Sequence, residues 1–212
     1  MVTTTVSPRA VIFDIGGVLV RTEDWSGRRK WENHLGLPER ALSTLVFECA
    51  AAIQASTERG HDEAIWQFVG EKCGLDLRDL SNLRADFWSG DRLNRDLADY
   101  VCQLRPQYTT GILSNAWPEM RDLNVGRFGL KGLVDETVYS FETGILKPDP
   151  RSYLYVLGRL KVQANEAIFV DDAERNILAA QGVGMRTVLF QNTTQAITDL
   201  NYLLGVRHGG FL

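Results

Sequence analysis

The sequence predicts an α/β protein with a doubly wound, parallel sheet of five or more strands and a helical insertion after the first strand. Five short apolar segments rich in β-branched residues are bounded by turn signals, as is typical of buried parallel strands. Helical patterns separate the later segments, and this alternation favours right-handed crossovers within one sheet. The first two segments are about ninety residues apart, far more than one crossover helix needs.

Each predicted strand is a short apolar stretch. In chain order the five stretches are AVIFD (Ala10–Asp14), TTGILS (Thr109–Ser114), TVYS (Thr137–Ser140), AIFVD (Ala167–Asp171) and RTVLF (Arg186–Phe190). Between the third and fourth strands, Tyr153, Val156, Leu157 and Leu160 recur at i, i+3, i+4 and i+7. This spacing predicts a helix that packs one face on the core.

The long first connection has the pattern of several helices. Glycine and proline punctuate it, which predicts helices over Trp25–Leu35, Glu39–Ser56, His61–Cys73 and Leu77–Trp88. A segment of this length can form a bundle of its own and stand over the sheet. We therefore expect a core domain made of residues 1–20 and 89–212 and a helical cap domain made of residues 21–88.

Composition narrows the class of protein. The 212 residues are 44% hydrophobic and 24% charged, which is ordinary for a globular chain. The net charge of −4 and the dispersed Lys and Arg argue against a nucleic-acid partner, and no apolar run is long enough to predict a membrane partner. Three scattered cysteines form neither a zinc pattern nor a disulfide framework, which favours the cytoplasm. Monomer and homodimer both remain open.

Polar residues gather where the predicted strands end. Asp14 ends the first strand, Ser114-Asn115 the second and Asp171-Asp172 the fourth, while Lys147 follows the third. Ligands of open parallel sheets bind beyond this edge. Taken singly, each residue also has a structural explanation, as a helix cap or a turn residue. Two adjacent carboxylates at a desolvated strand end repel each other and require a cation, and Mg²⁺ suits such oxygen ligands.

Four segments carry a resemblance to a known family. In chain order, FDIGGVL, ILSNA, the lysine of GILKPD and FVDDAERN resemble the four motifs of the haloacid dehalogenase-like (HAD) hydrolases. The resemblance implies a Rossmann-like HAD core with a C1 cap inserted after the first strand, where the helical segment lies. It is strongest to the subgroup of bacterial sugar-phosphate phosphatases such as glucose-1-phosphatase.

The resemblance implies a role for each motif residue. Asp14 would be the nucleophile that forms an aspartyl-phosphate. Ser114 and Asn115 would bind the phosphate, and Lys147 would neutralise its charge and hold Asp14 in place.

The same resemblance implies a Mg²⁺ cofactor. Its protein ligands would be Asp14, Asp172, the backbone carbonyl of Gly16, and Asp171 through water. These roles describe a Mg²⁺-dependent phosphatase of a small phosphorylated metabolite, with a sugar phosphate favoured.

Two other functions remain open. A 2-haloacid dehalogenase shares the Asp, Ser-Asn and Lys motifs without a metal, but it resembles this chain less because its fourth motif lacks the paired aspartates. A non-catalytic phospholigand-binding protein is the alternative from another class, and Gly16 is its support.

Gly16 departs from the family pattern, which usually has a second aspartate two residues after the nucleophile. That aspartate protonates the leaving group and then activates water, and such catalysis contributes about 10²- to 10⁴-fold. If the chain turns over a phosphate ester, either the substrate has an easy leaving group, such as an anomeric hydroxyl or a phenol, or another acid substitutes. Glu23, Asp24 and His34 of the cap linker are the candidates for that acid.

Overall fold

The fold is built on one five-stranded parallel sheet with the strand order β5-β4-β1-β6-β7. The computed structural model describes residues 6–58 and 62–206. The sheet strands are β1 (Ala10–Phe13), β4 (Thr109–Ser114), β5 (Glu136–Tyr139), β6 (Ala167–Asp171) and β7 (Arg186–Leu189). Strand β1 lies in the middle, paired in parallel with β4 and β6. The predicted doubly wound sheet is thereby confirmed.

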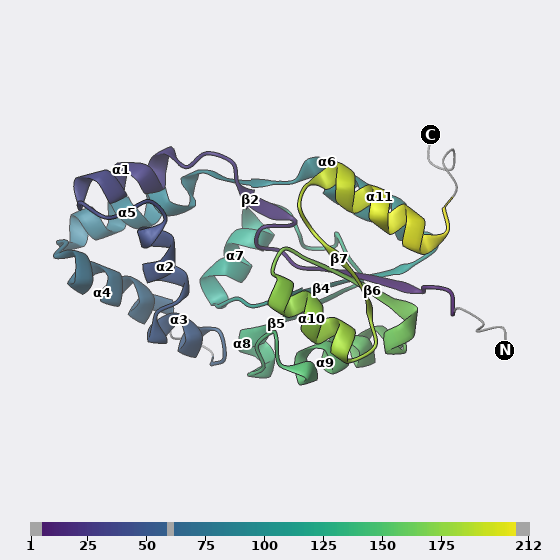
Figure 1. Cartoon of the computed structure of the whole chain (residues 1–212). Coiled ribbons are helices and arrows are strands. Elements are labelled where there is room, and N and C mark those ends of the chain that lie inside the picture. The colour runs from purple at the N-terminus through teal and green to yellow at the C-terminus, as the bar shows by residue number, and fades with distance from the viewer. Residues whose placement is uncertain (1–5, 59–61, 207–212) are drawn as a thin grey trace.

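Helices cover both faces of the sheet (Figure 1). Helices α6 (Arg95–Leu104) and α11 (Thr193–Leu204) pack on one face, and α9 (Pro150–Leu160) and α10 (Glu174–Gly182) pack on the other. The predicted stripe from Tyr153 to Leu160 is buried in α9. The shorter elements are α7 (Pro118–Gly126), α8 (Ser140–Thr143) and the 3₁₀ helix η1 (Ala164–Glu166). Within the described residues, every helix is too short or too polar to cross a membrane.

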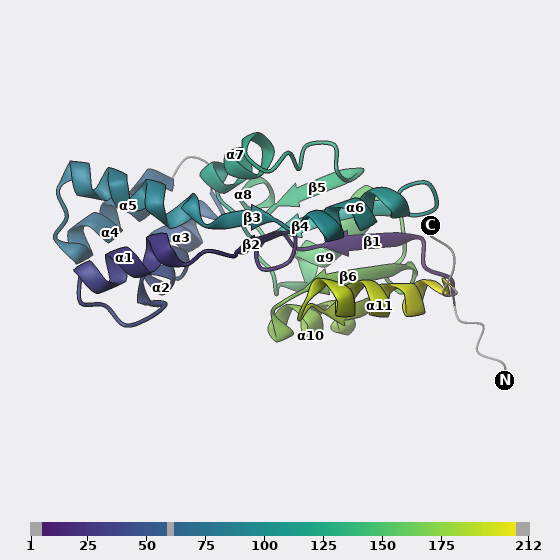
Figure 2. The ribbon, with the colours of Figure 1, turned by 90° about the horizontal axis from the view of Figure 1, so that it is seen from above.

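Five helices form a separate bundle at one end of the molecule (Figure 2). They are α1 (Ser26–His34), α2 (Ala41–Phe47), α3 (Ala50–Ala55), α4 (Asp62–Cys73) and α5 (Leu77–Ser89). Trp66, Leu83 and Phe87 are fully buried in the hydrophobic core of this bundle, where aromatic rings contact one another. The helical insertion after the first strand is therefore confirmed.

One predicted helix of the insertion is wrong. The pattern over Glu39–Ser56 predicts a single helix, but the structure has two, α2 and α3, separated at Glu48 and Cys49. Cys49 is extended, with ψ 158°, and its sulfur accepts a hydrogen bond from the Ala52 amide at 3.4 Å. The cysteine thus acts as an N-cap and starts a new helix. The predicted start of the next helix, His61, lies outside the described residues.

A two-stranded antiparallel ribbon joins the bundle to the sheet domain. It consists of β2 (Val20–Thr22) and β3 (Asp91–Leu93), in which Thr22 faces Asp91. Sequence reasoning missed both strands, because each has three residues and no apolar alternation. The ribbon lies next to the predicted domain boundaries, and it carries both crossings of the chain between bundle and sheet.

Candidate active site

The carboxyl ends of three adjacent strands bring the predicted residues together. Asp14 follows β1, the central strand, while Ser114 ends β4 and Asp171 ends β6 on either side of it. Buried strands place all three side chains at one edge of the sheet, and each of them is itself buried. The sequence prediction that these positions converge agrees with this arrangement.

Lys147 lies between two of the carboxylates. Its Nζ is 2.8 Å from Oδ1 of Asp14 and 2.7 Å from Oδ2 of Asp171, and the side chain is only 1% exposed. Burial alone would lower the pKa of Lys147, but the two carboxylates outweigh it and raise the pKa above its ordinary value. Lys147 is therefore a permanent cation in the centre of the site.

Asp171 is held by donors of the protein on both oxygens. The Ala173 amide donates to Oδ1 at 2.8 Å, and Nδ2 of Asn176 lies 2.9 and 3.0 Å from Oδ1 and Oδ2. Together with Lys147 these donors fix the orientation of a fully buried carboxylate. Sequence reasoning missed Asn176, whose position in the first turn of α10, five residues after Asp171, is the signal that would have identified it.

Three carboxylates form a cluster that suits a cation. Asp14, Asp171 and Asp172 each offer an oxygen, and these oxygens lie within 4.8 Å of one another. Burial, and then the charges of Asp171 and Asp172, raise the pKa of Asp14 to about 7 despite the opposing effect of Lys147. Partial burial and the charge of Asp171 also raise the pKa of Asp172, which is the exposed member of the cluster. One lysine does not compensate three carboxylates, so the donor set fits a divalent cation with oxygen ligands.

The two glycines after Asp14 differ in their surroundings. Gly17 has φ +79°, and a Cβ placed there would lie 2.0 Å from Oδ2 of Asp172. Only glycine therefore allows the backbone to approach this carboxylate. A Cβ at Gly16 would meet no atom within 4 Å. No hydrogen bond from a described residue occupies the Gly16 carbonyl, which leaves it open to a cation.

Ser114 and Asn115 have different environments. The Asn115 amide group donates to the Lys147 carbonyl at 2.9 Å and accepts from the Lys147 amide at 2.8 Å. Asn115 therefore positions the backbone of Lys147, and its substrate-binding role stays a prediction. The Ser114 hydroxyl, in contrast, shares no hydrogen bond with another described side chain, and the residue is buried. Its phosphate-binding role likewise stays a prediction.

A cavity of about 760 Å³ opens beside the carboxylates. Gly16, Gly17, Asn115 and Asp172 line it from the sheet domain. The ribbon and the helical bundle line a second part of it, with Val20, Arg21, Thr22, Asp91, Trp25, Arg28, Arg40, Phe47 and Trp88. The remaining lining residues also belong to the sheet domain and are Ile15, Met120, Leu123, Asn124, Phe128, Phe190 and Gln191. This cavity is the space in which a ligand could reach both parts of the molecule.

The acids proposed to replace the missing aspartate lie elsewhere. Glu23 lines a different hollow, Asp24 accepts a hydrogen bond from the Ser26 amide at 2.8 Å where α1 begins, and His34 packs against Trp31. Of the described residues that line the cavity, the carboxylates are Asp172 and Asp91. Sequence reasoning missed Asp91, because its neighbours in the sequence carry no motif.

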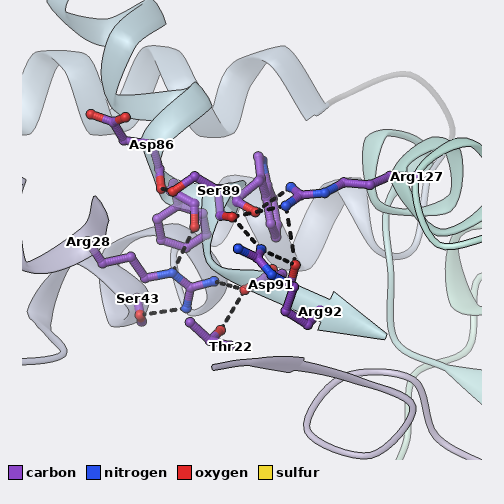
Figure 3. Close-up of polar contacts among 10 residues, drawn as sticks. Thr22, Arg28, Ser43, Asp86, Ser89, Asp91, Arg92 and Arg127 are labelled. Atoms are coloured by element: carbon purple, nitrogen blue, oxygen red, sulfur yellow. Dashed lines mark hydrogen bonds and ion pairs between the residues drawn. The ribbon is translucent and has the colours of Figure 1, made fainter. Parts of the chain in front are cut away.

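Asp91 links the ribbon to the bundle (Figure 3). Its Oδ1 accepts from the Thr22 hydroxyl at 2.6 Å and from the Arg28 guanidinium at 3.1 Å. Arg28 also donates to the Phe87 carbonyl and the Ser43 hydroxyl. Both members of the ion pair are buried, with side chains 5% and 10% exposed. The pair therefore fixes the bundle where it meets the cavity.

The family model of the haloacid dehalogenase-like hydrolases matches residues 8–184. This range includes Asp14, Ser114, Lys147 and both late aspartates. The chain belongs to the haloacid dehalogenase-like hydrolase family. The family predicted from the four motifs is thus confirmed.

Curated relatives of the hydrolase include enzymes with different names. The chain is 26% identical over 224 residues to bifunctional epoxide hydrolase 2 of Mus musculus, and this match covers 94% of the chain and 39% of that protein. It is 23% identical over 216 residues to D-ribitol-5-phosphate phosphatase of Bacteroides thetaiotaomicron, covering 92% of this chain and 97% of that protein. The hydrolase therefore spans about two fifths of the length of the mammalian relatives that it matches.

Solved structures share the fold. A HAD family enzyme of Bacteroides thetaiotaomicron in complex with magnesium and inorganic phosphate superposes with a TM-score of 0.71 at 18% identity, covering 87% of the hydrolase and 94% of that chain. L-2-haloacid dehalogenase of Xanthobacter autotrophicus, with chloropropionic acid covalently bound, gives a TM-score of 0.64 at 20% identity, covering 92% and 82%. The same fold thus occurs in a HAD family enzyme solved with magnesium and phosphate and in a haloacid dehalogenase.

Proposed function

We propose that this hydrolase is a Mg²⁺-dependent phosphatase that acts on a small phosphorylated metabolite, with a sugar phosphate favoured. The observation that carries the proposal is the cluster of Asp14, Asp171 and Asp172, whose oxygens lie within 4.8 Å of one another. Lys147 pairs with Asp14 and Asp171. Such a cluster would bind a divalent cation, and cation and lysine together would attract a phosphate dianion.

The proposed reaction has two displacements at phosphorus. An oxygen of Asp14 attacks the phosphorus, the bond to the ester oxygen breaks, and the leaving group departs with the bonding electrons and takes a proton from water. Water then attacks the phosphorus of the aspartyl-phosphate, which releases inorganic phosphate and restores the Asp14 carboxylate. A bound Mg²⁺ would stabilise the charge that develops on the phosphoryl oxygens.

The residues around Asp14 would orient this chemistry. Asp14 is held by Lys147 and by the Ile15 amide, which donates to its Oδ1 at 2.7 Å. The Ser114 hydroxyl would donate to a phosphoryl oxygen, and Lys147 would neutralise part of its charge. In phosphoryl transfer, such positioning and charge stabilisation supply most of the catalysis.

The carboxylate cluster argues against dehalogenation as the main activity. A 2-haloacid substrate is itself a carboxylate, and three carboxylates that one lysine compensates only in part would repel it in the absence of a metal. In a Mg²⁺-dependent phosphatase, the same carboxylates would bind the metal ion. The name of the relative D-ribitol-5-phosphate phosphatase, which the chain covers almost completely, supports a phosphorylated polyol or sugar.

Gly16 supports a second candidate, a non-catalytic protein that binds a phosphorylated ligand. The position offers neither an acid for the leaving group nor a base for the water. We favour turnover, because the nucleophile, the lysine and the cation ligands are all in place, and an anomeric or phenolic leaving group needs little protonation.

We also propose a reducing compartment such as the cytoplasm, since Cys49, Cys73 and Cys102 are free.

The test is phosphate release from a sugar 1-phosphate, a sugar 6-phosphate and an aryl phosphate, each in Mg²⁺ and in EDTA. We expect release in Mg²⁺ only, with a loss of at least about 10³-fold in Asp14→Asn. Asp122→Asn is the matched control, because this exposed residue pairs with Arg121 on the surface.

Three other outcomes would contradict the proposal. Release in EDTA equal to that in Mg²⁺ would exclude the metal. Chloride release from 2-chloropropionate without metal would favour a dehalogenase. If no ester is hydrolysed but a sugar phosphate raises the melting temperature, the binding protein is correct.

A further inference from the structure

Two arginines and a tryptophan gather where the helical bundle lines the cavity. The guanidinium carbon of Arg40 lies 3.2 Å from the ring centroid of Trp25, and that of Arg28 lies 5.0 Å from the same centroid. All three residues line the cavity that also contains Gly16 and Asp172. We call Trp25, Arg28 and Arg40 the arginine site.

The charge of Arg28 is already compensated. It is buried and donates to Asp91 at 3.1 Å, to the Phe87 carbonyl at 3.0 Å and to the Ser43 hydroxyl at 3.2 Å (Figure 3). These three acceptors occupy the guanidinium and balance its charge. Arg28 therefore acts as the fixed part of the site.

The charge of Arg40 has no comparable partner among the described residues. Its carboxylate contact is to the neighbouring Glu39, at 3.9 Å, and both side chains are more than half exposed, at 52% and 66%. A pair of this kind contributes little and is screened by salt. In addition, burial and, less strongly, the nearby charge of Arg40 lower the pKa of Arg28 against the opposing charge of Asp91. Two like charges are thus held close together, and the buried carboxylate of Asp91, on the ribbon, pairs with Arg28.

The backbone at Arg40 is unusual as well. Its φ is +72°, which residues with a side chain rarely adopt, and the residue stands at the N-cap of α2 without a capping side-chain hydrogen bond. An unfavourable conformation that the surrounding structure maintains is a reason to look for a functional role. In this conformation the guanidinium reaches the cavity and stacks on Trp25.

We propose that the arginine site binds a second anionic group of the substrate, on the leaving-group side and apart from the phosphate that is hydrolysed. The preferred substrate is then a phosphate ester that also carries a carboxylate or a second phosphate. This inference rests on the proposed phosphatase function, since it assigns the scissile phosphate to the carboxylate cluster. A planar guanidinium stacked on an aromatic ring is well suited to either oxyanion.

The third arginine of the cavity has a different position. Arg21 is on the ribbon, and its guanidinium carbon lies 5.5 Å from the ring centroid of Phe190. Burial raises the pKa of Asp172, and the charge of Arg21 opposes this rise more weakly. Its charge therefore acts at the cation end of the cavity. Arg40 is the better residue to test, because it is exposed and its replacement leaves the buried core intact.

The experiment compares substrates that differ only in the remote anion. 3-Phosphoglycerate and glycerol 3-phosphate differ in a carboxylate, and glucose 1,6-bisphosphate and glucose 1-phosphate differ in a phosphate. We expect kcat/KM of the Mg²⁺-loaded chain to be at least tenfold higher for the more anionic member of one pair, and the pair identifies which anion is bound. Arg40→Gln should reduce that ratio at least fivefold, mainly through KM, whereas Arg29→Gln, an exposed arginine outside the cavity, should not change it.

Calorimetric binding to Asp14→Asn separates this inference from the proposed function. If wild-type chain hydrolyses no ester, the phosphatase proposal fails, yet Asp14→Asn should still bind the more anionic member more tightly and lose the preference with Arg40→Gln. Equal kcat/KM within both pairs, or equal ratios in Arg40→Gln and Arg29→Gln, would overturn the arginine site while leaving a phosphatase intact. Equal dissociation constants within both pairs would overturn it as well.

Discussion

Gly16 and Gly17 lie side by side in the sequence but have opposite requirements. Gly17→Ala would push a Cβ against Oδ2 of Asp172 in a backbone conformation that disfavours side chains. We therefore expect Gly17→Ala to weaken Mg²⁺ binding at least about tenfold, as displacement of a ligand does. Gly16→Ala is the control, because its Cβ meets no atom within 4 Å. Equal Mg²⁺ affinity in the two variants, measured by calorimetry, would contradict this account.

The open space at Gly16 also permits a gain of activity. Gly16→Asp would place a carboxyl group at the edge of the cavity, where it can donate a proton to the leaving group and then activate water. We expect kcat for an alkyl phosphate to rise by about 10²-fold, with a smaller rise for an aryl phosphate that needs no acid. Gly16→Asn, which has the same size and cannot transfer a proton, should show no gain. A gain shared by both variants would mean that the side chain acts through binding.

The raised pKa of Asp14 makes stability depend on pH. Unfolded Asp14 titrates at its ordinary value of 3.8 and folded Asp14 at about 7, so the folded chain binds more protons in this range. In EDTA the free energy of unfolding should therefore fall as pH rises from 3.8 to about 7. Because Mg²⁺ favours the ionised carboxylate, it should restore stability more at pH 8 than at pH 5.

Urea denaturation at the two pH values, with Mg²⁺ and with EDTA, measures this dependence. Asp14→Asn lacks the titrating group and should lose most of the fall between pH 5 and pH 8 in EDTA. If Asp14→Asn keeps the full slope, the dependence comes from another group and the assignment to Asp14 is wrong.

At the scale of elements, the sequence predicted the strands and helices whose signal lies in the local pattern of residues. The five sheet strands are apolar and β-rich, and the α9 stripe repeats with helical spacing, so each carries its own signal. The ribbon does not, because β2 and β3 are short and polar and their partners are distant. Thr22 and Asp91 are 69 positions apart. The motifs revealed Asp14, Lys147 and Asp171 but not Arg40, whose contact with Trp25 joins separate positions of the insertion. Asn176 stands within the fourth motif, and only its hydrogen bonds to Asp171 show its role.

The ribbon and the bundle are joined by the buried pair of Asp91 and Arg28. Asp91→Asn would keep the shape of the side chain but leave the Arg28 charge buried without a carboxylate. We expect the free energy of unfolding to fall by about 3 kcal/mol. Asp122→Asn, on an exposed pair, should cause little or no change. Chemical denaturation measures both, and an equal, small effect would mean that the buried pair contributes no more than a surface one.

At the scale of the molecule, the bundle contacts the sheet domain through α7 as well as through the ribbon. Trp117 packs into the hydrophobic core of the bundle, and Glu119 accepts from Trp66 Nε1 at 2.8 Å and from Arg84 at 2.7 Å. These contacts hold the bundle beside the cavity. Their partners come from separate segments of the chain, so sequence patterns could place a cap after the first strand but not the side chains that it turns toward Asp14.

The central claim is that Asp14 takes the phosphoryl group in a Mg²⁺-dependent reaction. With an aryl phosphate the first step needs no acid, whereas the second step lacks a base at Gly16 and should be slow. A rapid-mixing measurement in Mg²⁺ should therefore show a burst of about one phenol per chain before slower turnover. The burst should be absent from Asp14→Asn and in EDTA. Phenol formation by Asp14→Asn at the wild-type rate would contradict the account.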